Sequence, residues 1–234
     1  MLFCAMIEIM LYPICVVMMI FYRYGCRFVW ILGISMRLQS FVYFFPKQAK
    51  RCVFRFLADN SIKRIDGLCM NNLGVCYARG YGVRQSPRKA FLWYKCAARR
   101  NCAQSMHSLG GCYYNGFGTN VCYEAAFKAF RQAVRHGHIK SACFLGLMHY
   151  RGEFVKKSER RACLWYRYGA LHGDCNSQYD YSICLRYGEG CERATEDADK
   201  WLSVAARNGS EEAKIALRQL NPATANTHMT SWTA

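Results

Sequence analysis

The sequence predicts an all-α protein: an α-solenoid of four 36-residue antiparallel helix-pair repeats plus a capping helix, preceded by a hydrophobic helical amino-terminal segment. Three observations support this. From residue 68 onward a pattern of Leu, Tyr, Gly and Ala recurs every 36 residues without a gap. Within each period, apolar residues are spaced three and four apart, as on one face of a helix. Hydrophobic residues make up 53% of the 234 and only four are proline, which excludes a disordered chain.

The first 46 residues are the most hydrophobic part of the chain. Residues 1–22 are interrupted only by Glu8 and Pro13, and two shorter apolar stretches follow before residue 46. The first stretch is about long enough to cross a bilayer core of roughly 30 Å. We predict that residues 1–46 are a membrane anchor or a targeting segment, and a third interpretation is a hydrophobic helix packed on the rest of the protein. Residues 47–67 are predicted to be a basic connecting helix or linker.

Each repeat is predicted to begin with an amphipathic helix, called helix A. The leading position of each repeat is followed four positions later by a residue on the same helical face: Tyr77, Tyr113, His149 or Leu185. Seven positions after the leading residue a glycine occurs in all four copies. Glycine tolerates the positive φ that ends a helix, so it should terminate helix A. The leading residues are Leu73, Leu109, Leu145 and Tyr181, and the glycines are Gly80, Gly116, Gly152 and Gly188.

A second helix, helix B, is predicted to follow in each repeat, over about residues 86–100 in the first. An alanine column marks its packing face, and a Trp three positions later occurs in repeats 1, 3 and 4. One helix pair cannot bury both of its apolar sides, whereas stacked pairs can, which predicts a solenoid over residues 68–220. Residues 211–220 are predicted to form the capping helix, and 221–234 a disordered tail. The alanines are Ala90, Ala126, Ala162 and Ala198.

The motifs of the first repeat resemble a known family. Between Leu73 and Ala98 the chain reads Leu-Gly-x-x-Tyr, then G-x-G-V, then K-A-x-x-W-Y-x-x-A-A. This pattern resembles the Sel-one-like repeat (SLR) family, which is related to tetratricopeptide repeats. The resemblance covers residues 68–220 and implies a scaffold or adaptor for protein complexes, often at a membrane. A cysteine-rich bacterial branch of the family joins each repeat by a disulfide; Cys96 and Cys102 are the nearest approach to that pattern here.

The charge distribution separates the two halves of the chain. The formal net charge is +17, and residues 1–152 carry 21 basic and 4 acidic residues, whereas residues 153–234 carry 11 of each. A basic front half favours an anionic neighbour: lipid headgroups, nucleic acid or an acidic protein. Nucleic-acid binding needs exposed aromatic rings as well, and Trp93 belongs to a predicted core column. A basic nucleic-acid-binding repeat protein is therefore the less favoured alternative.

Neither a catalytic site nor a metal or cofactor site is predicted. Between residues 67 and 152 the only acidic residue is Glu124, so this part has no carboxylate pair for acid–base catalysis. His136 and His138 lie near Cys143, but their spacing matches no metal site. A secreted or periplasmic SLR protein with hydrolase-like activity, as suggested for disulfide-rich relatives, is a second alternative. The cysteine column at Cys76, Cys112, Met148 and Cys184 is interpreted as packing, with reduced thiols.

The predicted function is therefore a non-catalytic interaction scaffold that binds a protein on the concave face of the solenoid. If the groove-facing positions of tetratricopeptide repeats apply here, helices A line that face, and Arg and Tyr there are typical of binding hot spots. We expect membrane association through residues 1–46 with the repeats facing the cytosol, or alternatively an organelle-targeted, secreted or periplasmic protein. The candidate partner-binding residues are Asn71, Arg79, His107, Tyr114, Asn115, Tyr150, Arg151, Tyr179, Arg186 and Tyr187.

Overall fold

A computed structural model describes residues 51, 54–55, 58 and 66–220 of the chain, and all regular structure within these residues is helical. The predicted segment 1–46, most of 47–67 and the tail 221–234 lie outside the described residues. The described helices belong to one compact unit, residues 51–234. They are α4 (Gly67–Arg79), α5 (Pro87–Ala98), α6 (Ala103–Asn115), α7 (Tyr123–Arg135), α8 (Ser141–Arg151), α9 (Glu159–Leu171), α10 (Cys175–Tyr187), α11 (Thr195–Arg207) and α12 (Glu211–Leu220).

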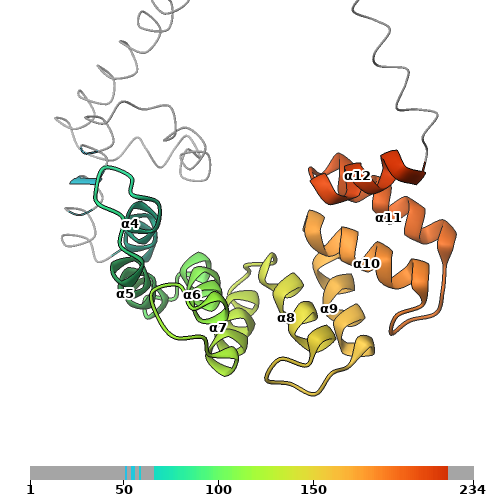
Figure 1. Cartoon of the computed structure of the whole chain (residues 1–234), viewed down its shortest axis with the longest axis horizontal. Helices are drawn as coiled ribbons and strands as arrows, with labels where there is room; N and C mark the ends of the chain where they lie inside the picture. The colour runs from blue at the N-terminus through green and yellow to red at the C-terminus, as the bar shows by residue number, and fades with distance from the viewer. Residues whose placement is uncertain (1–50, 52–53, 56–57, 59–65, 221–234) are drawn as a thin grey trace, which may run out of the picture. The chain divides into compact units, whose positions relative to one another are not determined.

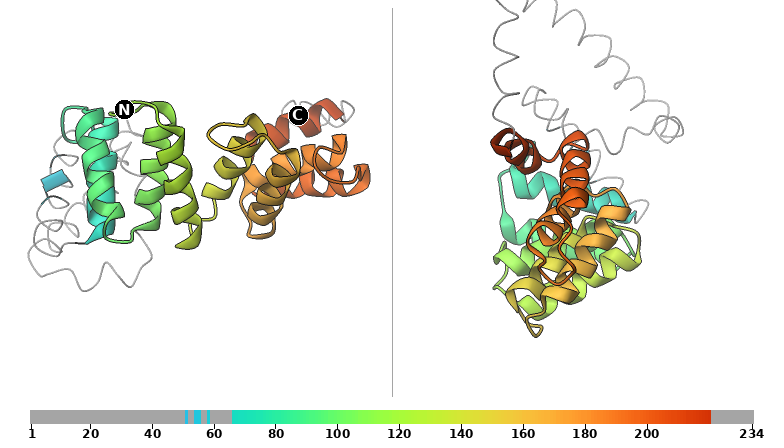
Figure 2. Two further views of the ribbon diagram at one scale, coloured as in Figure 1. Left: turned by 90° about the horizontal axis from the view of Figure 1, so that it is seen from below. Right: turned by 90° about the vertical axis from the view of Figure 1, so that its right-hand side faces the viewer.

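The helices pack as four consecutive pairs, which confirms the predicted solenoid of helix-pair repeats (Figure 1). Helices A are α4, α6, α8 and α10, and helices B are α5, α7, α9 and α11. Each helix A packs on the helix B that follows it, and each helix B also contacts the helix A of the next repeat. The same succession is visible from two further directions (Figure 2). Among the described residues, no helix is long and apolar enough to cross a membrane.

Backbone geometry confirms the predicted carboxy-terminal ends of helices A. Gly80 closes α4 with a φ of 73°, and its N–H donates to the carbonyl of Cys76; the glycines at 116, 152 and 188 close their helices in the same way. Helix α5 begins one residue later than predicted, because Ser86 is its amino-terminal cap and accepts from the N–H of Lys89 at 3.4 Å. It ends two residues earlier, at Ala98.

Small residues set the distance between the two helices of a repeat. A Cβ atom added at Gly74 would lie 2.6 Å from the ring of Tyr94, and one added at Gly146 would lie 2.5 Å from Tyr166. The glycine that follows the leading leucine therefore lets an aromatic ring of helix B lie directly against helix A. The alanine column faces the same interface and is fully buried at all four positions. Trp93, predicted to be a core residue, is only half-buried.

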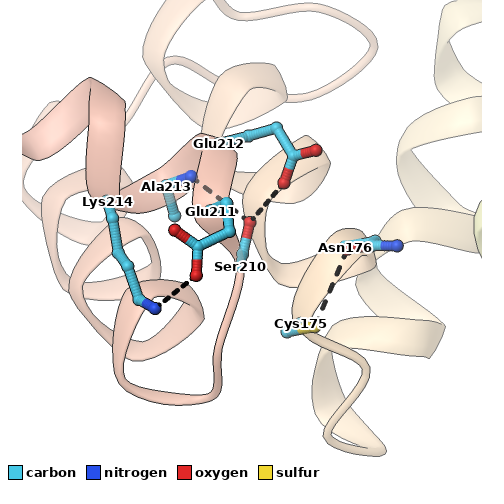
Figure 3. Close-up of polar contacts among 7 residues, drawn as sticks. All are labelled: Cys175, Asn176, Ser210, Glu211, Glu212, Ala213 and Lys214. Carbon is cyan, nitrogen blue, oxygen red and sulfur yellow. Dashed lines mark hydrogen bonds and ion pairs between the residues drawn. The ribbon is translucent and has the colours of Figure 1, made fainter. Parts of the chain in front are cut away.

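The capping helix α12 is present where the sequence predicts it. Its Ala213 packs against Leu202 and Ala205 of α11. Buried Ser210 caps its start: the Ser210 hydroxyl accepts from the N–H of Ala213 at 3.2 Å and contacts the Glu212 carboxylate at 3.1 Å (Figure 3). Because α12 occupies the place of a fifth helix A, it covers the apolar side of the fourth repeat.

Candidate functional site: the helix A surface

The position two residues before each leading residue joins neighbouring repeats. The hydroxyl of Ser105 donates to the side-chain oxygen of Asn71 at 3.0 Å, and both side chains are fully buried. One repeat later, His107 Nδ1 lies 2.9 Å from the hydroxyl of Ser141. Each pair links a helix A to the next helix A across 34 residues. Asn71 was predicted to face a partner, but it is enclosed between repeats.

The two remaining members of this position are also engaged in packing between repeats. The thiol of Cys143 donates to the Asp180 carboxylate at 3.2 Å. Burial raises the pKa of Asp180 to about 6, although the bond from Cys143 opposes that shift. Tyr179 is half-buried against the cluster of Leu202 and Ala205 beneath α12. Of the four residues in this column, none is an exposed contact residue.

His107 lies in a cluster of rings at the junction of repeats 2 and 3. Its ring stacks on that of His138 at a centroid distance of 4.4 Å, and His138 Nδ1 also reaches the Ser141 hydroxyl at 3.0 Å. The rings of Phe130 and Phe144 close the other sides. Burial, then His138 and Lys140, lower the pKa of His107 to about 4, and burial lowers that of His138 as well. Both rings are therefore neutral near neutral pH.

The sequence placed His138 with His136 and Cys143, whereas the structure places it with His107. Among the described residues no group of three or more His, Cys, Asp or Glu side chains could hold a metal ion. The pairing of His107 with His138 was not predicted, because a separation of 31 residues corresponds to neither the 36-residue period nor a helical spacing.

Tyr114 and Arg151 are brought together by the fold. Arg151 Nη1 donates to the Tyr114 hydroxyl at 3.0 Å and lies 3.7 Å from the Glu153 carboxylate. Burial and the nearby Glu153 carboxylate raise the pKa of Tyr114. One repeat later Glu189 raises the pKa of Tyr150, but Tyr187 stands in the place of the arginine. A tyrosine of one repeat thus lies near a glutamate of the next, and sequence analysis did not single out either glutamate.

The exposed members of the candidate set form one column. They are the last residue of each helix A, directly before the glycine that ends it, and they recur every 36 residues. We call this column the helix A rim: Arg79, Asn115, Arg151 and Tyr187, all of them exposed. Tyr187 is 66% exposed, and the Arg79 guanidinium contacts the Tyr81 hydroxyl at 3.4 Å. Beside the rim, Arg186 forms an ion pair with Asp199 of α11.

A shallow hollow on the surface of α9 was not predicted. It is lined by Arg161, Leu164, Trp165 and Tyr168. Trp165 was assigned to a core column, but its ring is only half-buried and lines this hollow, while Leu164 is 56% exposed. The Trp column of helices B therefore lies at the edge of the core.

The helix pairs of the structure coincide with the segments that a known family model matches. The Sel1 repeat matches residues 67–102, 103–138, 139–174 and 175–210, four adjoining segments of 36 residues. The chain belongs to the Sel1 repeat family. Sel1 repeat proteins are typically protein-interaction scaffolds. The family boundaries agree with the structure, since each segment begins at the first residue of a helix A or, in the third repeat, two residues before it.

Solved structures of Sel1 repeat proteins have the same fold. A Sel1 repeat protein from Oxalobacter formigenes is 25% identical with a TM-score of 0.65, over 72% of this chain and 73% of that protein. The protective antigen c5321 of uropathogenic Escherichia coli, which displays an SLR fold, is 24% identical with a TM-score of 0.64. That match covers 74% of this chain but only 37% of the antigen. A comparison with curated protein sequences gave no match.

Proposed function

We propose that this Sel1 repeat protein is a non-catalytic adaptor that binds a segment of a partner protein along the concave face lined by helices A, with the helix A rim as its main contact. The observation that supports this proposal is that the candidate residues fall into two groups, one packed between repeats and one exposed. The candidates that lie two residues before each leading residue pack between repeats. The rim residues, by contrast, are exposed at the same place in every repeat. A regularly spaced column suits an extended segment that crosses several repeats.

The chemistry of the rim supports a protein partner. Arginine and tyrosine concentrate binding energy at interfaces, because a planar guanidinium or a rigid ring loses little conformational entropy for the contacts it makes. Arg151 is already oriented by the Tyr114 hydroxyl and the Glu153 carboxylate. A side chain that is already held in place loses less conformational entropy on binding than one that is free to rotate.

The charge of the first two repeats indicates an acidic partner segment. Between residues 66 and 152 the only acidic residues are Asp66 and Glu124, whereas basic residues recur throughout. Complementary charge speeds association and excludes partners of like charge. We infer that the bound segment places acidic residues near Arg79 and more neutral or aromatic residues near Tyr187.

We further propose that the protein is held at a membrane by residues 1–46, with its repeats in the cytosol. The support is the apolar sequence of that segment and the basic residues that follow it. Protease treatment of intact membranes carrying a carboxy-terminally tagged chain tests this orientation. Digestion of the tag is the expected result, and a protected tag contradicts the cytosolic orientation.

The adaptor proposal is tested by quantitative affinity capture with two matched triple variants of the full chain. The rim variant carries Arg79→Ala, Arg151→Ala and Tyr187→Ala. The control carries Arg88→Ala, Arg160→Ala and Leu171→Ala, which are exposed on helices B and also remove two guanidinium groups and one large apolar side chain. We expect at least one protein to be retained by the wild type and the control but reduced about tenfold or more with the rim variant. Equal losses in both variants contradict the rim assignment.

A further inference from the structure

Three cysteines gather where the third and fourth repeats meet. Cys163 is in α9, Cys184 is in α10, and Cys191 is in the loop between α10 and α11. The thiol of Cys163 lies close enough to both other thiols for each to affect its pKa. Cys163 and Cys184 belong to one buried cluster with Ala162 and Tyr166, and the partly buried Cys191 packs against that cluster. Three nucleophilic side chains are therefore gathered in one cluster rather than spread over separate packing sites.

The other repeats show what these positions hold when packing alone decides. The position of Cys163 is Phe91 in repeat 1 and Phe127 in repeat 2, and that of Cys191 is occupied by valine or threonine. Phe91 packs beside Cys112, and Phe127 beside Met148, in the corresponding clusters. Only between repeats 3 and 4 is the phenylalanine replaced by a thiol with a second thiol opposite. Packing explains the column of Cys184 but not the other two cysteines.

The contacts of Cys163 favour its thiolate. The neighbouring Cys184 and Cys191 thiols, together with the nearby charge of Arg167, lower the pKa of Cys163, against the effect of burial. The neighbouring Cys163 and burial raise the pKa of Cys184, so this residue keeps its proton. Burial raises the pKa of Cys191 to about 11. One nucleophilic sulfur thus lies between two protonated ones.

We propose that Cys163 and Cys191 form a reversible disulfide when the protein encounters a peroxide. The Cys163 thiolate attacks one oxygen of the peroxide, the O–O bond breaks, and Cys163 becomes a sulfenic acid. The Cys191 sulfur then attacks the sulfenic sulfur, forming the S–S bond and releasing water. With hydrogen peroxide, two thiols and one peroxide give one disulfide and two water molecules. A thiol reductant restores both cysteines. This inference is independent of the proposed adaptor function.

The position of Cys191 makes it, rather than Cys184, the resolving cysteine. Cys184 is 3% exposed and fixed within α10, in a column that is filled by Cys or Met in every repeat. Cys191 is half-buried in the loop that follows Gly188, where the backbone is not held by helical hydrogen bonds. A loop residue can make the small backbone shift that disulfide geometry requires. Cys163 itself is 4% exposed, so only a small oxidant such as a peroxide is expected to reach it.

The experiment follows individual thiols in the reduced full chain during graded treatment with hydrogen peroxide. Remaining thiols are alkylated, oxidised thiols are reduced and alkylated with a heavier reagent, and tryptic peptides are quantified by mass spectrometry. The three cysteines fall in separate peptides, 162–167, 168–186 and 187–193. Cys112 is the internal control, because it shares the column of Cys184 but is packed beside Phe91. We expect Cys163 and Cys191 to be oxidised together at least tenfold faster than Cys112, with a reducible 163–191 linked peptide.

Two variants copied from other repeats complete the test. Cys191→Val introduces the valine of positions 83 and 155, so the fold should be kept; the linked peptide should be absent and Cys163 should proceed to sulfinic acid. Cys184→Met introduces the residue of position 148 and removes a thiol that lowers the pKa of Cys163, so oxidation of Cys163 at pH 7 should slow about tenfold. The proposal is overturned if Cys163 reacts no faster than Cys112, or if Cys163 is linked to Cys184 instead.

Discussion

The junction between repeats 2 and 3 and the junction between repeats 3 and 4 use the same helix positions but fill them with different side chains. At the first, fully buried Ala133 faces the next repeat, and the rings of His107, Phe130 and Phe144 fill the space between helices. At the second, the position of Ala133 is occupied by Gly169, and an added Cβ there would lie 2.2 Å from the Ser177 hydroxyl. The first junction is filled by aromatic rings, whereas the second combines a close approach of two helices with the Cys143–Asp180 hydrogen bond.

This difference shows which features the repeat fixes and which it leaves free. The alanine column and the glycines that end helices A are the same at both junctions, because backbone geometry and helix spacing within a repeat require them. The residues that join one repeat to the next vary, since any well-packed combination satisfies the same interface. Surface chemistry can therefore change along the solenoid without a change of fold.

The largest effect is expected from Phe130→Ala at the first junction. Phe130 is fully buried and stacks on Phe144 at 4.7 Å, so its loss leaves a cavity among rings that cannot collapse easily. We expect a loss of about 3–5 kcal/mol in the free energy of unfolding, measured by urea denaturation. Leu171→Ala, at a residue that is 62% exposed, is the control and should change stability by less than about 0.5 kcal/mol. Similar losses in both variants contradict this description of the junction.

A smaller effect is expected from Gly169→Ala at the second junction. The added methyl group overlaps Ser177, so the two helices must separate, at a cost of about 1–3 kcal/mol. The same alanine is present at the equivalent positions 97, 133 and 205. An Ala substitution that leaves urea stability unchanged would show that the helices at the second junction are spaced as at the others.

The two junctions should also respond to pH in opposite directions. The folded pKa of His107, about 4, lies below its unfolded value of about 6.5, so its contribution is lost as pH falls from about 6.5 to 4. The folded pKa of Asp180, about 6, lies above its reference value of 3.8, so stability is lost as pH rises from about 4 to 6. Each effect is expected to be about 1–3 kcal/mol.

Variants copied from repeat 1 separate these two contributions. His107→Asn introduces the residue of position 71, which bonds the equivalent serine, and should reduce the loss with falling pH to the part that comes from His138, whose pKa is also lowered by burial. Asp180→Asn introduces the residue of position 72 and should leave only the loss with falling pH. Urea unfolding between pH 4 and 7 measures both. The pKa assignments are wrong if either variant keeps in full the pH dependence that it should remove or reduce.

The sequence predicted the elements of this fold well because their causes are local. Gly80 and Ala90 each meet a steric requirement within one repeat, and such requirements recur every 36 residues. Burial between repeats could not be predicted in the same way. Whether Asn71 faces solvent or Ser105 depends on how far each helix pair is rotated relative to the next, which no single repeat specifies. For the same reason the proximity of Tyr114 to Glu153 was not predicted. The rim residues were predicted as contact residues, but in one set with residues that turn out to pack between repeats.

The central claim is that a partner protein binds along the helix A rim, and site-specific photocrosslinking tests it most directly. A photoreactive phenylalanine analogue is placed in the full chain at Asn115, in the middle of the rim, or at Gln132, which is exposed on α7 of the same repeat. We predict that irradiation in cells gives a discrete crosslinked partner from position 115, with little or none from position 132. A partner crosslinked from position 132 but not from position 115 would contradict the claim and place the binding surface on helices B.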